Sequence, residues 1–278
     1  MESIPELAPQ LIASGLARPR GLAFDGDGHL WIAEEAGSAI VRVDAESREM
    51  SRFDVGGGPR GLAIDAYGRV WFSDVVNACI RRLDPEDKKT KTITSRADGE
   101  CLDQPHDLIF DARGNLVFTC FSGNVCCVRP GGETEMIANE LTEPSSLALV
   151  GHELLLILES GQRRIWRGSW SDDLCHWIDD TIWAQDLGKS SNPTSFARGV
   201  DGKLYLVLAG EERIIVLDHD GMIVENIPTP GLSANYCAFD PAGAMGLVLG
   251  DSREGSVYSI PALGPGALLY DAGAAWSL

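Results

Sequence analysis

The most reactive pair of adjacent residues in the sequence is His106 and Asp107, which are suited to proton transfer. They lie in LDQPHDLIFDARGNLVFTC at 102–120, where similar stretches of the chain read PRG. An imidazole titrates near neutral pH, so we expect His106 to act as an acid or base, with Asp107 or a neighbour orienting it. Tyr236 could donate a hydrogen bond to a developing oxyanion, and an aromatic cap is the alternative.

A second group of residues could hold a substrate. Arg20 and Arg60 each follow a proline in a PRG stretch, and a planar guanidinium suits a carboxylate, enolate or phenolate. The other candidates for substrate binding are Ser145, Thr194, Asn235, Glu159 and Cys120. We expect the hydroxyl side chains to widen a pocket rather than act as nucleophiles, because no Gly-x-Ser-x-Gly motif accompanies them.

These candidates recur at fixed places in an internal repeat. Six stretches share a proline anchor, an alternating run, a turn rich in Gly and Asp, and a second hydrophobic run, as in RPRGLAFDGDGHLWIAE and GPRGLAIDAYGRVWFSD. The anchors lie at residues 19, 59, 105, 144, 193 and 234, the last being an alanine. A repeat of roughly forty residues is the size of one four-stranded propeller blade.

Each copy contains two further short runs, which predicts four antiparallel strands per copy. The sequence therefore predicts an all-β fold, a single six-bladed β-propeller over residues 1–278. The run QLIASGL at 10–16 has no blade of its own, so we expect this N-terminal strand to complete the last blade and close the ring. The C-terminal run ALLYDAG at 267–273 competes for that place.

The phrase Pro-x-Gly-Leu-Ala-(Phe/Ile)-Asp, followed by Gly-x-(Leu/Val)-Trp and by RIWRGSW at 164–170, resembles the six-bladed SMP-30/gluconolactonase/LRE-like propellers. The first two copies also look like NHL repeats and streptogramin-lyase propellers. The resemblance implies a central channel lined by the first strand of each blade. It also implies a divalent metal at one mouth, held by Glu, Asn and Asp at the residue after each anchor. Those positions are Arg20, Arg60, His106, Ser145, Thr194 and Asn235.

Three of these positions depart from the ligand set that the resemblance implies. Arg20 stands where the Glu is expected, Ser145 where an Asn is expected and Thr194 where the Asp is expected. Two guanidinium groups beside such a ring would repel a hard cation, which prefers anionic oxygen ligands. We therefore expect no cofactor, and a divalent metal remains the alternative.

Counting residues from each hairpin turn assigns a cross-strand partner to four candidates. The pairs are Arg20 with Glu34, Arg60 with Asp74, His106 with Cys120 and Ser145 with Glu159, the last two with an error of about one residue. The first two pairs predict structural ion pairs, and an arginine free to bind substrate is the functional alternative. A histidine near a cysteine could form a base and a nucleophile, although packing explains most such neighbours.

The composition indicates a soluble globular protein, and the expected central pocket indicates a small-molecule substrate. A formal net charge of −18 argues against nucleic acid and anionic membranes as partners. No run approaches the roughly 20 apolar residues of a membrane span, and the N-terminus lacks a signal-peptide pattern, so we expect a cytoplasmic protein. The seven cysteines lack CxxC spacing and predict buried free thiols. The tryptophan-rich insertion at 171–191 could form a lid or the outer edge of a blade.

Three functions remain open from the sequence. The leading one is a metal-independent enzyme that cyclises, isomerises or eliminates from a small molecule of secondary-metabolite type in the central pocket. The alternative is a lactone or ester hydrolase whose divalent cation is held by Glu34, Asp74, Glu159 or Asp251. The third is a binding propeller without catalysis, since a fold does not fix a function.

Overall fold

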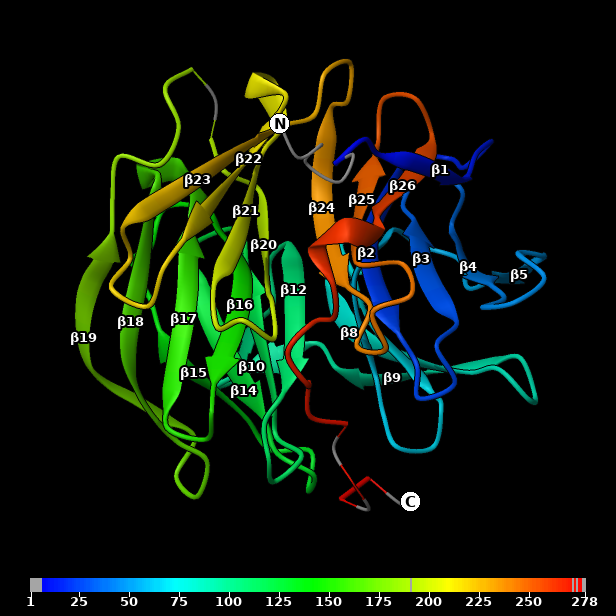
Figure 1. Cartoon of the computed structure of the whole chain (residues 1–278). Helices are drawn as coiled ribbons and strands as arrows, with labels where there is room; N and C mark the ends of the chain where they lie inside the picture. The colour runs from blue at the N-terminus through cyan, green and yellow to red at the C-terminus, as the bar shows by residue number, and fades with distance from the viewer. Residues whose placement is uncertain (1–6, 191, 272, 274, 277–278) are drawn as a thin grey trace.

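The computed structural model describes residues 7–190, 192–271, 273 and 275–276. Its strands form six four-stranded antiparallel sheets, and a short two-stranded ribbon lies outside them. The six sheets are the blades of a propeller (Figure 1). The predicted all-β, six-bladed fold is therefore confirmed.

The bounds of the strands follow blade by blade, from the first strand to the outermost one. The first two blades contain β2 (Pro19–Phe24), β3 (Leu30–Glu34), β4 (Ala39–Val43) and β5 (Met50–Asp54), then β6 (Pro59–Ile64), β7 (Val70–Asp74), β8 (Cys79–Asp84) and β9 (Lys89–Thr94). The next two contain β12 (Pro105–Phe110), β13 (Leu116–Cys120), β14 (Asn124–Val128) and β15 (Thr134–Ala138), then β16 (Pro144–Val150), β17 (Leu154–Glu159), β18 (Arg164–Ser171) and β19 (His176–Ala184).

The last two blades contain β20 (Ser195–Arg198), β21 (Leu204–Leu208), β22 (Arg213–Leu217) and β23 (Ile223–Pro228), then β24 (Ala234–Phe239), β25 (Leu247–Asp251), β26 (Ser256–Ile260) and β1 (Gln10–Ala13). The ribbon is made of β10 (Arg96–Ala97) and β11 (Glu100–Cys101). Three single 3₁₀ turns complete the described elements: η1 (Ser160–Gln162), η2 (Ala209–Glu211) and η3 (Pro261–Leu263).

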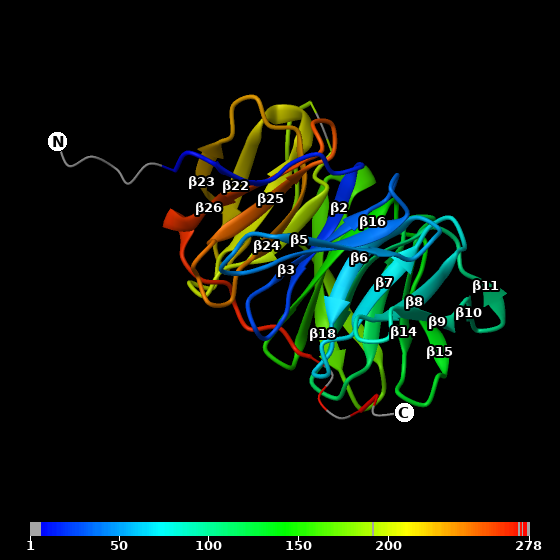
Figure 2. The same ribbon diagram turned by 90° about the vertical axis from the view of Figure 1, so that its right-hand side faces the viewer.

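The first strands of the six blades surround the central axis. Each contacts the first strands of its two neighbours, in the order β2, β6, β12, β16, β20, β24 and back to β2. Figure 2 shows β2, β6, β16 and β24 near the middle of the molecule and β11, β15 and β23 at its periphery. The blades are equivalent, so all first strands begin at the same end of the axis, which we call the anchor end.

The N-terminal strand completes the last blade. β1 pairs antiparallel with β26, and Leu11 lies opposite Tyr258. The predicted closure by the N-terminal strand is therefore confirmed. The competing C-terminal run leaves the sixth blade instead, and the backbone N–H of Ala267 donates to the carbonyl oxygen of Arg198 in the fifth blade at 2.9 Å.

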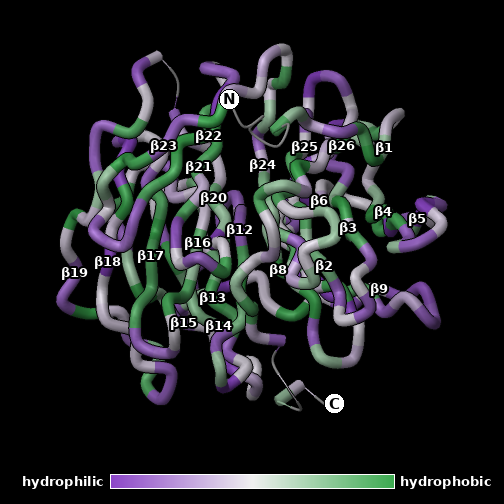
Figure 3. The backbone as a smooth tube through the Cα atoms, viewed as in Figure 1, coloured by the Kyte–Doolittle hydropathy of each residue, from purple (hydrophilic) through white to green (hydrophobic). Residues whose placement is uncertain are grey.

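The hydrophobic core lies between blades rather than in one central mass. The buried apolar residues form six clusters, and each cluster fills the gap between two adjacent blades. Figure 3 shows hydrophobic residues following the strands and hydrophilic residues following the loops. Alternating strand patterns produce this arrangement, because each blade must cover a neighbour on both faces.

The Asp and Trp of the repeated phrase act together at the first turn of a blade. Asp25 accepts the backbone N–H of His29 at 2.9 Å and the indole N–H of Trp31 at 2.7 Å. The second blade repeats the contact, with 2.8 Å between the Trp71 indole nitrogen and Asp65. The phrase that carries the family resemblance therefore fixes the hairpin turns of the fold.

The hairpin count is wrong by one residue in the first two blades, and in the third and fourth blades the same difference of one residue lies within the expected error. The anchor proline, and not the residue after it, lies opposite the predicted partner: Pro19 with Glu34, Pro59 with Asp74, Pro105 with Cys120 and Pro144 with Glu159. The cause is an irregularity in each first strand, such as the one between Pro19 and Leu22 in β2, which changes the pairing register.

Three smaller predictions also have an outcome. All seven cysteines are free thiols, and six of them are buried, as expected. The part of the insertion up to Ala184 forms the outer hairpin of β18 and β19, so it is the edge of a blade, while Ser191 lies outside the described residues. Within the described ranges, no helix is long and apolar enough to cross a membrane.

Candidate functional site

The six residues that follow the repeat anchors lie together at the anchor end, and we call them the anchor ring. The ring comprises Arg20, Arg60, His106, Ser145, Thr194 and Asn235. His106 and Ser145 are buried, whereas the other four side chains are partly exposed. The fold therefore places two cationic, one aromatic and three neutral polar groups around one end of the axis.

His106 and Tyr236 meet across the axis of the propeller. The third and sixth blades face each other in the ring, and the Tyr236 hydroxyl lies 2.9 Å from Nε2 of His106. Nδ1 of His106 lies 2.9 Å from the backbone carbonyl oxygen of Ser145. A carbonyl oxygen only accepts, so Nδ1 carries the proton and Nε2 accepts the hydrogen bond that Tyr236 donates.

The environment of this pair keeps both residues neutral. Burial, together with the positive charges of Arg60 and Arg20, lowers the pKa of His106 to about 3. The ring of Phe121 stacks on the imidazole with a centroid distance of 5.2 Å. Burial also raises the pKa of Tyr236, so this residue keeps its proton. The expectation of an imidazole that titrates near neutral pH is therefore wrong, because His106 is neutral there.

Asp107 turns away from the imidazole and toward the fourth blade. Its Oδ2 accepts the hydroxyl of Ser146 and the backbone N–H of Leu147, each at 3.0 Å. The carbonyl of Ser145, and not Asp107, orients the imidazole of His106. Burial raises the pKa of Asp107 to about 6, against the lowering effect of these hydrogen bonds.

Arg20 and Arg60 share a carboxylate that the hairpin count did not assign to them. Nε and Nη2 of Arg60 lie 2.9 and 2.8 Å from Oε2 of Glu35, and Nε of Arg20 lies 3.3 Å from the same oxygen. Oε1 of Glu35 pairs with Nη1 of Arg18 at 2.9 Å. The predicted pairs of Arg20 with Glu34 and of Arg60 with Asp74 are therefore wrong, because the register shift moves both arginines toward Glu35.

The carboxylates considered as metal ligands hold the loops of their own blades instead. Four buried acids each accept a backbone N–H from the loop that precedes the first strand: Glu34 from Ala17, Asp74 from Gly58, Glu159 from Thr142 and Asp251 from Ser233, at 2.8 to 3.0 Å. Three of them also pair with arginines of their own blades: Glu34 with Arg52, Asp74 with Arg81 and Glu159 with Arg164.

A divalent cation does not fit the donors at the anchor end. At Asp74, burial acts to raise the pKa, but the hydrogen bonds from Gly58, Asn77 and Arg81 outweigh it and hold the pKa below its usual value. Such a carboxylate already has its full set of donors. The ring itself supplies guanidinium groups where a hard cation needs anionic oxygen. We therefore derive no step through a metal.

The remaining candidates occupy different surroundings. The Ser145 hydroxyl lies 2.5 Å from that of Ser160, and both are buried. The Thr194 hydroxyl is buried and has no hydrogen-bond partner among the described residues. Asn235 is partly exposed at the same end. Cys120 is 1% exposed and packs in the hydrophobic cluster between the second and third blades, so the structure does not bring it into the ring of polar groups.

Two residues of the site were missed by sequence reasoning, Glu35 and Phe121. Both directly follow the second strand of their blade, after β3 and β13. The signal was available in the repeat, because the residue after the second strand lies at the anchor end in every copy. It differs between copies as the anchor ring does, with Glu35 in the first blade and Phe121 in the third.

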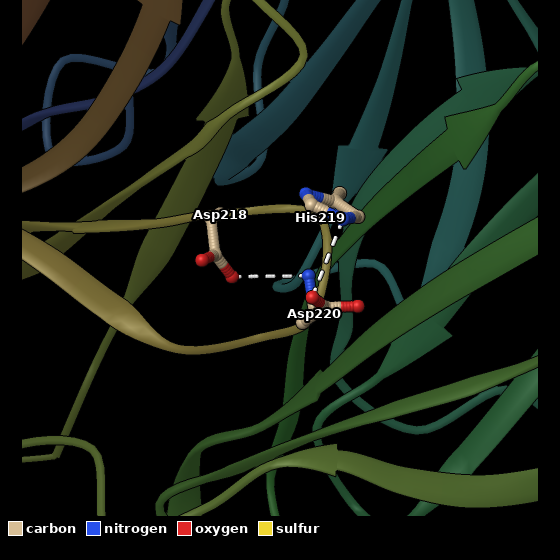
Figure 4. A group of neighbouring side chains, drawn as sticks. All are labelled: Asp218, His219 and Asp220. Atoms are coloured by element: carbon tan, nitrogen blue, oxygen red, sulfur yellow. Dashed lines mark hydrogen bonds and ion pairs between the residues drawn. The ribbon is translucent and has the colours of Figure 1, made fainter.

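A separate acidic cluster lies in the turn between β22 and β23, and Figure 4 shows its three side chains. Asp218 accepts the backbone N–H groups of Asp220 and Met222 at 3.0 Å, and His219 pairs with Asp220 at 3.3 Å. The carboxylate of Asp218 therefore stabilises the turn by accepting these two hydrogen bonds. His219 is 86% exposed, so the cluster belongs to the surface and not to the anchor end.

Comparisons with known proteins give no match to a family model and no match to a curated sequence. Solved structures do match. A gluconolactonase from Xanthomonas campestris is 22% identical, with a TM-score of 0.78 over 89% of this chain and 87% of that one. A luciferin-regenerating enzyme is 13% identical, with a TM-score of 0.80 over 96% of this chain and 99% of that one.

A third matching structure is a catalytically inactive histidine-to-alanine variant of virginiamycin B lyase from Staphylococcus aureus. It is 17% identical, with a TM-score of 0.66 over 88% of this chain and 80% of that one. At these identities the likeness establishes a shared fold. The chain therefore shares the six-bladed propeller fold of these enzymes, which is the fold that its repeated phrase predicts.

Proposed function

We propose that the protein is an enzyme that binds a small organic anion at the anchor end and acts without a bound divalent cation. The reaction is a cyclisation, isomerisation or elimination in which negative charge develops on the substrate. One observation carries the proposal: Arg20 and Arg60 lie beside the neutral Tyr236–His106 pair, and their side chains are 17% and 16% exposed. Donors fixed in such a site stabilise developing charge more than they would in water.

Each residue of the pair has a role in this proposal. The Tyr236 hydroxyl donates its one proton to Nε2 of His106, so toward the substrate its oxygen accepts a hydrogen bond. Burial raises the pKa of Tyr236, so it does not act as a phenolate nucleophile. His106 positions the Tyr236 hydroxyl by accepting its proton in a hydrogen bond. A pKa of about 3 makes the imidazole a weak base, so we assign His106 to positioning in place of acid–base catalysis.

The test starts with a screen of hydroxy, keto and unsaturated organic acids for conversion, followed by mass spectrometry. On a converted substrate, Arg60→Met should lower kcat/KM about a hundredfold, because a donor to developing charge is lost. Tyr236→Phe should lower kcat about tenfold. Arg253→Met is the matched control, since the side chain of Arg253 is 59% exposed and bonds only to its neighbour Glu254 and to the carbonyl oxygen of Gly231 among the described residues, and it should leave both constants unchanged.

Metal removal separates the proposal from the hydrolase alternative. Dialysis against a chelator should leave the conversion rate unchanged, because the carboxylates near the anchor end already bond to the protein. Loss of activity on chelation, with recovery on addition of calcium or zinc, would instead support a metal-dependent lactonase or esterase.

A second candidate function is binding without catalysis. It is favoured by the imidazole of His106, which is hydrogen-bonded at both nitrogens and stacked against Phe121 and Tyr236. Side chains whose hydrogen-bonding groups are all paired can have a purely structural role, linking opposite blades at the centre of a propeller. In that case, anions bind to the protein and are recovered unchanged, and no acid of the screen is converted.

A further inference from the structure

We infer that Glu35 is the specificity-determining residue of the anchor end and that it restricts the ligand to one carboxylate-type negative charge. This inference rests on the proposed function in one respect, namely that an organic anion binds at the anchor end. It assigns Glu35 a positioning role, since the residue acts through the arginines that contact the ligand.

Glu35 holds three arginines from two blades in one place. Its carboxylate meets Arg18 through Oε1 and both Arg20 and Arg60 through Oε2, at distances of 2.8 to 3.3 Å. The side chain of Glu35 is only 12% exposed. A flexible arginine that is fixed in this way loses less conformational freedom when it binds an anion, which favours affinity.

The contacts with Glu35 leave part of each guanidinium group unused. Arg60 contacts Glu35 through Nε and Nη2, whereas Nε of Arg20 lies 3.3 Å from Glu35 and is buried without a hydrogen bond among the described residues. Among the described residues, Nη1 of Arg60 and both Nη atoms of Arg20 have no hydrogen-bond acceptor. These N–H groups belong to partly exposed side chains close to Tyr236, with 6.0 Å from the Arg20 guanidinium carbon to the Tyr236 ring centroid. They can therefore receive the oxygens of one carboxylate.

The charges around the Tyr236 hydroxyl set the number of negative charges that the ligand can bring. Arg60, Arg20, Asp107 and Glu35 all act on this hydroxyl, and Arg18 joins the group through Glu35. With both acids ionised, three positive and two negative charges leave one positive charge. A monoanion neutralises it. A second negative charge on the ligand would lie near the carboxylates of Asp107 and Glu35, and no further positive charge would compensate their repulsion.

Glu34, the last residue of β3, differs from Glu35 because its contacts are those of a purely structural carboxylate. Glu34 is fully buried and accepts the backbone N–H of Ala17. Glu35 accepts no backbone N–H among the described hydrogen bonds and meets only guanidinium groups. The repeat does not need an acid at this place, because the corresponding residues in the other blades are Val75, Phe121, Ser160, Ala209 and Ser252. Glu35 is therefore specific to the first blade and to its arginines.

The experiment measures the selectivity of the site with two probes of similar size. Isophthalate carries two negative charges at pH 7.5, and its monomethyl ester carries one. Isothermal titration calorimetry should show that the wild-type protein binds the monoester at least tenfold more tightly than isophthalate. In Glu35→Gln, the local charge rises by one, so isophthalate should gain at least tenfold and the preference should disappear or reverse.

Two control variants and a folding assay separate an effect of Glu35 on ligand selectivity from an effect of net charge and from a loss of folding. Glu254→Gln makes the same change in net charge at an exposed acid, 59% exposed, and should leave the preference as it is in the wild type. Arg60→Met should weaken binding of both probes. Thermal unfolding of each variant confirms that it is folded, and the ratio of the two affinities is a readout that a merely structural role of Glu35 would not move.

Each outcome decides the inference separately from the proposed function. An unchanged preference in Glu35→Gln overturns it, as does a wild-type protein that prefers isophthalate or binds neither probe. A wild-type protein that selects the monoester but converts no substrate supports the inference and contradicts the proposed enzyme. An active enzyme whose preference does not depend on Glu35 contradicts the inference alone.

Discussion

At the anchor end, burial lowers the pKa of His106 and raises the pKa of Asp107, because it penalises the charged form of each residue. The folded-state pKa of Asp107, about 6, lies above its ordinary value of 3.8, so the folded protein holds an extra proton between these values. Its contribution to stability falls as the pH rises through that window. The folded-state pKa of His106, about 3, lies below 6.5, so stability is lost as the pH falls from about 6.5. The two effects partly cancel between pH 4 and 6.

Replacing Asp107 by Asn should reveal this balance. An amide oxygen can still accept from Ser146 or Leu147, but it carries no charge. We expect Asp107→Asn to raise the free energy of unfolding by about 1–2 kcal/mol at pH 8. A rise of the pKa from 3.8 to about 6 corresponds to about 3 kcal/mol at 1.36 kcal/mol per pKa unit, and the partial exposure of Asp107 reduces this value. At pH 4.5 the gain should shrink, and stability should depend more steeply on pH than in the wild type.

Urea unfolding at pH 4.5, 6 and 8 measures this difference. Asp103→Asn is the control, because Asp103 is exposed in the loop before the same strand. A variant of Asp107 that is equally stable at all three pH values, relative to wild type, would show that the carboxylate is not buried at a cost.

The sequence placed the candidate residues at one end of each repeat, but it predicted only part of their contacts. His106, Arg20 and Arg60 stand out because they replace one another at a fixed place in the repeat. The partner of the arginines, Glu35, could not be chosen over Glu34, because a one-residue irregularity in a strand is invisible in a hydrophobic pattern. The pKa of His106 depends on burial and on the charges of two other blades, which no local pattern reveals.

At the scale of the strand, the glycine of each PRG stretch permits the close approach of neighbouring first strands. A Cβ on Gly21 would collide with the carbonyl oxygen of Arg60, and a Cβ on Gly61 would collide with that of His106 and lie 2.8 Å from the Cα atom of Asp107. The third blade departs from PRG because Asp107 bonds across to the fourth blade. The strand that carries His106 is thus positioned by a glycine of the preceding blade.

Adding one methyl group should therefore disturb the site from a distance. Gly61→Ala forces β6 and β12 apart, and we expect it to lower the free energy of unfolding by about 1–3 kcal/mol. Anion binding at the anchor end should weaken as well, because Arg60 and His106 lie on the displaced strands. Gly26→Ala is the control, since a Cβ there meets nothing within 4 Å. Chemical unfolding and titration of an organic anion test both effects, and equal behaviour of the two variants would contradict this account.

The fold itself was predictable because each copy of the repeat carries its own strand and turn signals, most clearly in the first two copies. The turn aspartate, the tryptophan six residues later and the anchor proline recur in the first two copies, and their contacts are local to one hairpin. The C-terminal run was harder to place. It competed with the N-terminal run for the outer place in the sixth blade, and the pairing of β1 with β26, together with its own contacts with other blades, excludes it from that place.

At the scale of the whole molecule, the ring is held together at two places. The pairing of β1 with β26 closes the sixth blade. The C-terminal segment, red in Figure 1, then crosses the end opposite the anchor end. The backbone N–H of Ala267 donates to Arg198 in the fifth blade, and that of Ala66 in the second blade donates to Asp271 at 2.7 Å. The segment therefore connects blades that are not neighbours.

The attachment of this segment should depend on Trp276, which is 7% exposed. Its ring centroid lies 4.7 Å from that of Trp71, and its indole N–H donates to the carbonyl oxygen of Gly114 at 2.6 Å. We expect Trp276→Ala to lower the free energy of unfolding by about 3 kcal/mol, whereas Leu269→Ala, at a residue 71% exposed, should change it by less than about 0.5 kcal/mol. Anion binding at the anchor end should be unaffected in both, because the full length of the first strands separates the two ends. Urea unfolding and calorimetry measure the two properties. If Trp276→Ala unfolds like the wild type, β1 alone holds the ring closed.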